Sequence, residues 1–186
     1  MIILGSLVFI SIVFALVVAI RRQKVKVLSG RQLTCILAPL AIGIVAPSIV
    51  LFIVQITVGH MSPISSIADI IAGQFAEGRN LFLIALLSLI PFVLLTLILL
   101  RGVLSHPLRK CYSLGIGGMV GILSIMIPAH VSVWYGLYGG HPSSTAVIGF
   151  LFFPFYSIGA MALGLMVGWL VSLLPWFRAG TPGPER

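Results

Sequence analysis

The sequence predicts an all-α membrane protein: a polytopic bundle of five transmembrane helices with one short interfacial helix on its outer face. Composition is the first reason, because 60% of the 186 residues are hydrophobic and only 8% are charged. A soluble domain of this size needs more charge on its surface. The apolar residues also gather in runs of roughly 20 residues or more, the length that a helix needs to cross a bilayer.

The apolar runs give the boundaries of the expected spans. They cover residues 2–20, 33–58, 81–100, 112–134 and 145–174. The first run lacks a basic segment before it and a small-residue cleavage site after it, so we expect a retained span rather than a signal peptide. Residues 1–177 thus form a single transmembrane domain. The Pro- and Gly-rich residues 178–186 are predicted to be a disordered cytoplasmic tail.

Prolines interrupt each span after the first. They are Pro39, Pro47, Pro91, Pro128 and Pro154. A proline inside a helix removes one backbone hydrogen bond and favours a kink. Kinks open cavities in membrane bundles, but prolines are frequent in membrane helices of every function, so they do not discriminate between function classes.

The distribution of basic residues predicts the orientation. Ten of the 11 Lys and Arg residues lie in the loops 21–32 and 101–111 or in the C-terminal tail, and only Arg79 lies in an opposite loop. Since cytoplasmic loops are enriched in Lys and Arg, the N-terminus is expected outside and the C-terminus inside. The net charge of +8 is therefore assigned to topology and lipid head groups, not to nucleic acid. A bacterial inner membrane is the expected location.

The polar segment 59–80 between the second and third spans predicts the interfacial helix. Its isoleucines and Phe75 recur at helical spacing, whereas Asp69 and Glu77 fall elsewhere around the helix. Ser66 followed by Asp69 fits a capping box. This helix is expected either to cover the bundle or to dock a partner.

A candidate internal repeat of 81 residues relates two halves of the chain. Pro47 aligns with Pro128, and the Gly-His pair at His60 aligns with the pair at His141. A parallel duplication about an axis normal to the membrane explains this match, and so does coincidence in a Pro- and Gly-rich sequence.

Three histidines near the outer face are candidate metal ligands. His60 and His141 lie in outer loops, and His130 lies near the outer end of its span. With Asp69 and Glu77 at the same level, they offer ligand types suited to Zn²⁺ or Cu²⁺. Their spacing matches no established ligand motif. The alternative is that each imidazole bonds to the backbone, and no cofactor is the simpler expectation.

Small residues in the last two spans predict close helix packing. Gly117 and Gly121 have GxxxG spacing, and Ala160, Gly164 and Gly168 continue such a stripe on the last span. Packing of these two spans on each other is favoured over self-association or a partner helix. Trp134, Tyr135 and Tyr138 are expected to form an outer aromatic belt.

The remaining polar residues favour a non-catalytic protein. All three carboxylates lie outside the apolar runs, which counts against an ion-coupled transporter. Cys35 and Cys111 are expected to be reduced cytoplasmic thiols. We expect an accessory, assembly or partner-binding subunit of a membrane complex, in contact with the bilayer and with other subunits or further copies of itself. A small transporter or channel and an outer-face metal-binding protein or metalloenzyme are the alternatives.

Overall fold

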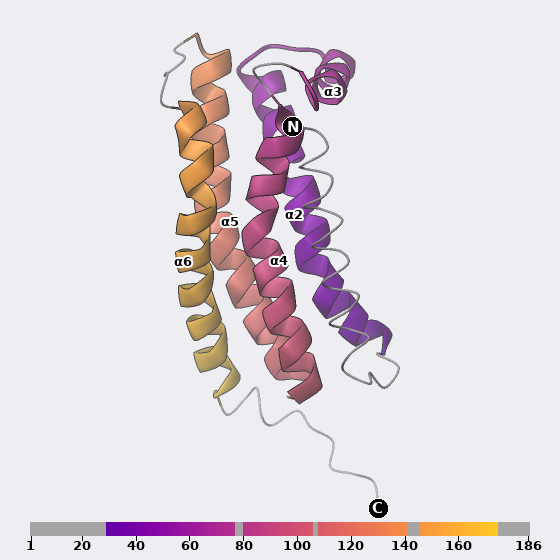
Figure 1. Cartoon of the computed structure of the whole chain (residues 1–186), viewed down its shortest axis with the longest axis vertical. Helices are drawn as coiled ribbons and strands as arrows, with labels where there is room; N and C mark the ends of the chain where they lie inside the picture. Colours follow the sequence, from indigo (N-terminus) through magenta and orange to yellow (C-terminus); the bar gives the residue numbers. More distant parts are fainter. Residues whose placement is uncertain (1–28, 77–79, 106–107, 141–145, 175–186) are drawn as a thin grey trace, which may run out of the picture.

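The described part of the chain is a bundle of long helices crossed at one end by a short one (Figure 1). The computed structural model describes residues 29–76, 80–105, 108–140 and 146–174. Its helices are α2 (Gly30–Thr57), α3 (Pro63–Ala72), α4 (Leu81–Ser105), α5 (Leu108–Tyr138) and α6 (Ala146–Ser172). α5 and α6 lie side by side, α4 packs against both and against α2, and α3 lies across one end of the bundle, here called the α3 end.

Four of the described helices are long and apolar enough to cross a membrane. They are α2, α4, α5 and α6, and they indicate an integral, multi-pass membrane protein. Each corresponds to one of the predicted apolar runs and continues through the prolines inside it. The predicted first span, 2–20, and the tail 178–186 lie outside the described residues.

Local hydrogen bonds explain where α2 and α4 begin. Ser29 forms a capping box with Gln32: the Ser29 hydroxyl accepts from the Gln32 backbone N–H, and Gln32 Oε1 accepts from the Ser29 N–H at 2.8 Å. Asn80 Oδ1 accepts from the Leu83 N–H at 3.1 Å at the start of α4. These polar groups satisfy N–H groups that a helix leaves unpaired in its first turn.

The predicted interfacial helix forms as α3, but the predicted capping residue is wrong. Ser62 is the N-cap, its side chain accepts from the Ser65 N–H, and Pro63 occupies the first turn, where its missing N–H costs nothing. Gly73 ends the helix. Ser66 is free for another role because it already lies inside the helix. Predicted residue Glu77 lies outside the described residues.

Buried apolar side chains fill the bundle in three layers. The middle layer comprises Leu89, Phe92, Leu95, Leu99, Ile122, Met126 and Met161. The layer at the α3 end comprises Val50, Leu51, Val54, Leu81, Trp134 and Phe150, and the layer at the opposite end comprises Cys35, Ile36, Leu100, Val103 and Cys111. The expected place of Trp134 in a surface aromatic belt is therefore wrong, since the ring is a core residue.

Candidate functional site

A buried polar cluster at the α3 end fastens α3 to the bundle. Gln55, near the end of α2, is fully buried. Its Nε2 donates to Asp69 Oδ2 and to the Tyr138 hydroxyl, each at 2.7 Å, and its Oε1 accepts from the Ser66 hydroxyl. Tyr138 in turn donates to Asp69 Oδ2 at 3.3 Å. Both polar atoms of the Gln55 amide are hydrogen-bonded, so one side chain links α2, α3 and α5.

This attachment turns the apolar face of α3 outward. Ser66 and Asp69 face the bundle, whereas Ile64, Ile67 and Ile71 lie one turn apart on the opposite face. Ile64 is 83% exposed and Ile71 is 68% exposed. A surface helix of a soluble protein has the reverse arrangement. Three exposed isoleucines on the outward face suit a helix in contact with lipid.

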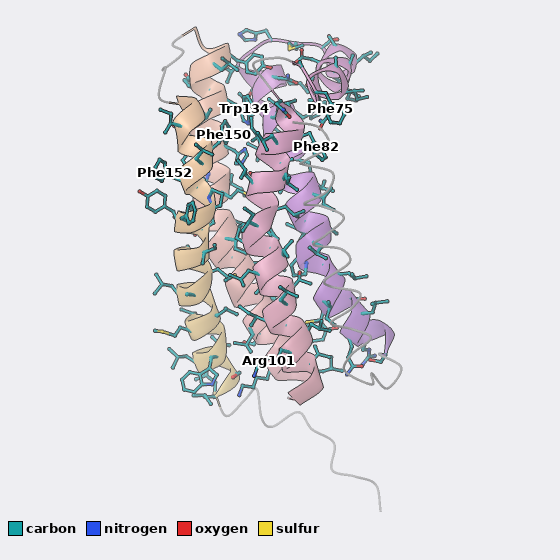
Figure 2. All side chains as sticks on the ribbon, viewed as in Figure 1. Phe75, Phe82, Arg101, Trp134, Phe150 and Phe152 are labelled. Carbon is teal, nitrogen blue, oxygen red and sulfur yellow. The ribbon has the colours of Figure 1, made fainter. Side chains whose placement is uncertain are left out.

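His130 lies inside the bundle, on α5 and further from the α3 end than Tyr138 of the Gln55 cluster. Its Nε2 is 2.9 Å from Ser88 Oγ on α4, and its ring lies 5.1 Å from the ring of Phe150 on α6. Trp134, one turn further along α5, contacts the same phenylalanine with ring centroids 5.3 Å apart. Figure 2 labels Trp134 and Phe150 at this level of the bundle. His130 thus bonds to a side chain of a neighbouring helix instead of to backbone.

The structure places His60 and His130 in different environments. His60 is exposed in the loop between α2 and α3, with a left-handed backbone (φ 51°), whereas His130 is buried among helices. Within the described ranges, no three His, Cys, Asp or Glu side chains form a group suited to a metal ion. His141 lies outside those ranges, so the three-histidine site stays a prediction.

The small-residue stripes meet at the contact between α5 and α6. A Cβ atom added to Gly117 would collide with the Gly164 carbonyl oxygen, and one added to Gly164 would collide with the Gly117 carbonyl oxygen. Gly121 faces the Ala160 carbonyl in the same way, and Gly168 faces that of Ser113. The Ser113 hydroxyl also donates to the Gly168 carbonyl at 2.7 Å. The two backbones therefore touch along about two turns, as small residues permit in lipid.

A long depression, here called the α5–α6 groove, follows this contact on the surface. Its volume is about 610 Å³, and its floor includes Gly117, Gly121, Gly164 and Gly168. The walls consist of apolar side chains: Ile116, Val120, Leu163, Val167 and Val171. The side chains of Ser113 and Ser124, which also line it, already donate to backbone carbonyls of this chain. The groove is therefore an apolar surface along α5 and α6, and the hydroxyls of Ser113 and Ser124 that line it already have hydrogen-bond acceptors within the chain.

Positive charge gathers at the end of the bundle away from α3. Arg31 at the start of α2, Arg101 near the end of α4 and Lys110 near the start of α5 share this end, where Figure 2 labels Arg101. Tyr112 ties two of these helices together, because its hydroxyl donates to the Arg31 carbonyl at 2.9 Å. Both cysteines are buried free thiols in the apolar layer at the same end.

Gln55 and Ser88, at the centre of the polar contacts, are not among the predicted site residues. Both lie within predicted apolar runs. Gln55 is the only amide side chain in the run 33–58. A lone amide inside a span requires a hydrogen-bond partner. That signal was available, but only the fold identifies the partners.

No family model, curated protein or solved structure matches this chain.

Proposed function

We propose that this chain is a non-catalytic, partner-binding subunit of a membrane complex. In this proposal the α5–α6 groove receives one apolar transmembrane helix of the partner. The observation that carries the proposal is the groove itself, with its glycine floor and its walls of Val, Ile and Leu side chains. Helices associate in lipid mainly through close packing at small residues, which such a floor offers.

The dimensions and the chemistry of the groove favour a helix. Its lining runs from Tyr112 to Ser124 on α5, a rise of about 18 Å at 1.5 Å per residue. An apolar helix suits it because Ser113 and Ser124 are already hydrogen-bonded within the chain. The middle of the described bundle is filled by side chains such as Phe92 and Leu95, both fully buried. A filled centre favours a packed scaffold over a conducting pore.

The proposed topology places the α3 end outside the cell. The shared location of Arg31, Arg101 and Lys110 supports a cytoplasmic opposite end under the positive-inside rule. With a first span at 2–20, this gives five spans with the N-terminus outside and the C-terminus inside. A bacterial inner membrane is the proposed location.

The test is purification of the full chain at native expression in a mild detergent, followed by mass spectrometry. We expect a second membrane protein at fixed stoichiometry. Val167 lines the groove and is 58% exposed, whereas the adjacent Met166 is 59% exposed and does not line it. Val167→Trp should therefore reduce the recovered partner at least about tenfold, and Met166→Trp should leave it unchanged.

Three outcomes contradict the proposal. If the chain purifies alone, it is not a stoichiometric subunit. If self-association replaces the partner and is lost in Val167→Trp, the groove serves a second copy. If a partner binds equally well to both variants, the chain is a subunit but the groove is not the interface.

A further inference from the structure

Two ring nitrogens inside the bundle have no hydrogen-bond partner among the described residues. They are His130 Nδ1 and Trp134 Nε1. His130 is 1% exposed and Trp134 is 4% exposed, so protein covers both rings. Buried polar side-chain atoms nearly always have a partner, because leaving one unpaired costs about 1–3 kcal/mol. Two such atoms one turn apart on α5 therefore call for a common explanation.

Both rings line the same small cavity. It has a volume of about 20 Å³ and is bordered by α2, the end of α3 and α4 as well as by α5. That volume holds one water-sized group. An O–H group there accepts from Trp134 Nε1–H and donates to His130 Nδ1, provided that the His130 Nε2–H donates to Ser88. A carbonyl oxygen also satisfies both nitrogens, in the other histidine tautomer. The shared requirement is one uncharged oxygen atom.

A second, larger cavity adjoins the first between α2 and α4. Its volume is about 270 Å³, and it shares Ser48, Gln74 and Ala85 with the small cavity. Its other lining side chains are apolar: Ile44, Phe82, Leu86 and Leu89. Ile44 is 54% exposed, so this space opens at the surface between α2 and α4. The larger cavity is suited to an apolar chain, and the shared lining residues place it next to the small cavity that the two rings line.

We propose that these joined cavities bind a membrane-soluble amphiphile with an alkyl or prenyl tail and a single uncharged oxygen as its head group. The tail lies between α2 and α4, and the oxygen bonds to His130 and Trp134. A charged head group is excluded by the small volume of the inner cavity and by its apolar surroundings, since burying an unpaired charge costs far more than burying a hydroxyl. This site is separate from the α5–α6 groove, with which it shares no lining residue.

The test uses the full chain in nanodiscs and a photoactivatable analogue of hexadecanol with a diazirine in its tail. We expect labelling of peptides that contain Ile44–Ser48 or Phe82–Leu89. Unlabelled hexadecanol should compete, whereas hexadecane should not, because only the alcohol supplies the oxygen. Competition by hexadecane to the same extent would overturn the proposal, since the cavity would then be a nonspecific apolar groove. Absence of labelling at these peptides would overturn it as well.

Two variants test whether the two rings bind the head group, and a third is the control. Trp134→Phe removes one donor, and His130→Gln keeps a polar group near the position of Nε2 for Ser88 but removes Nδ1. Each is expected to weaken competition by hexadecanol about threefold to tenfold, the usual effect of one neutral hydrogen bond. Trp169→Phe is the matched control, because Trp169 is 43% exposed on α6 and lines neither cavity. Equal competition in all three variants would show that the rings do not bind the oxygen.

Discussion

The pairs α2–α4 and α5–α6 are built from similar helices but are packed by opposite means. α5 and α6 meet at glycines, so backbone touches backbone and the large side chains are displaced to the surface beside the contact. In α2–α4 the one close glycine, Gly43, faces the Phe92 ring, so the helices are separated by side chains. The first pair consequently has a shallow groove along its contact, whereas cavities lie between the side chains of the second pair. Residue size at the contact decides which surface a membrane helix pair offers.

The largest effect is expected from adding a side chain to the α5–α6 contact. Gly164→Leu places new atoms against the Gly117 carbonyl, and backbone cannot move aside as a side chain can. We expect a loss of about 3 kcal/mol or more in the free energy of unfolding, the upper range for overpacking. Unfolding in detergent micelles, followed by circular dichroism during denaturant titration, measures it.

Gly159→Leu is the control for this prediction. Gly159 lies on the same helix, and a Cβ atom there meets nothing within 4 Å. The control should be within about 0.5 kcal/mol of the original protein, as surface substitutions usually are. Equal stability of Gly164→Leu and Gly159→Leu would show that α5 and α6 do not touch through their backbones.

The second effect concerns the attachment of α3. Gln55→Leu leaves Ser66, Asp69 and Tyr138 without the amide that joins them. A loss of about 2 kcal/mol is expected, because the fully buried Ser66 hydroxyl loses its Gln55 acceptor. Hydrogen exchange should rise in residues 62–73. Thr57→Val is the control, since the Thr57 hydroxyl donates only to the Ile53 carbonyl of its own helix; similar exchange in both variants would rule out the role given to Gln55.

A smaller effect is expected where the glycine faces a side chain. In Gly43→Ala the new Cβ lies 2.7 Å from Phe92 Cδ2, and the ring has to shift. We expect a loss of about 1 kcal/mol, and a larger loss for Gly121→Ala, whose Cβ meets the Ala160 carbonyl. If the two alanine variants lose equal stability in the same unfolding assay, the contrast between the helix pairs is wrong.

The smallest effect is expected from His60 and His141. The double variant His60→Ala, His141→Ala should not change the zinc or copper content of the purified protein, measured by inductively coupled plasma mass spectrometry. The reason is that His60 is exposed, whereas His130 is buried in the bundle. Stoichiometric metal in the original protein that disappears in the double variant would instead support the predicted three-histidine site.

The sequence by itself determined where the helices lie. Apolar runs of sufficient length, together with basic residues between them, predicted the four described spans to within a few residues, because a bilayer requires continuous helices with apolar surfaces. Periodic isoleucines likewise predicted α3. The stripes with Gly117 and Gly164 were visible as spacing, since small residues in lipid-facing sequence have few other uses.

Only the tertiary structure decided which polar atoms meet. Gln55 and Tyr138 are 83 residues apart along the chain, and the sequence does not show that their side chains meet. In the same way, periodicity gave no sign that Trp134 points inward beside His130 instead of outward to the membrane surface. Local sequence governs helix formation through the backbone, but the rotation of each helix about its axis depends on the packing of all its neighbours at once.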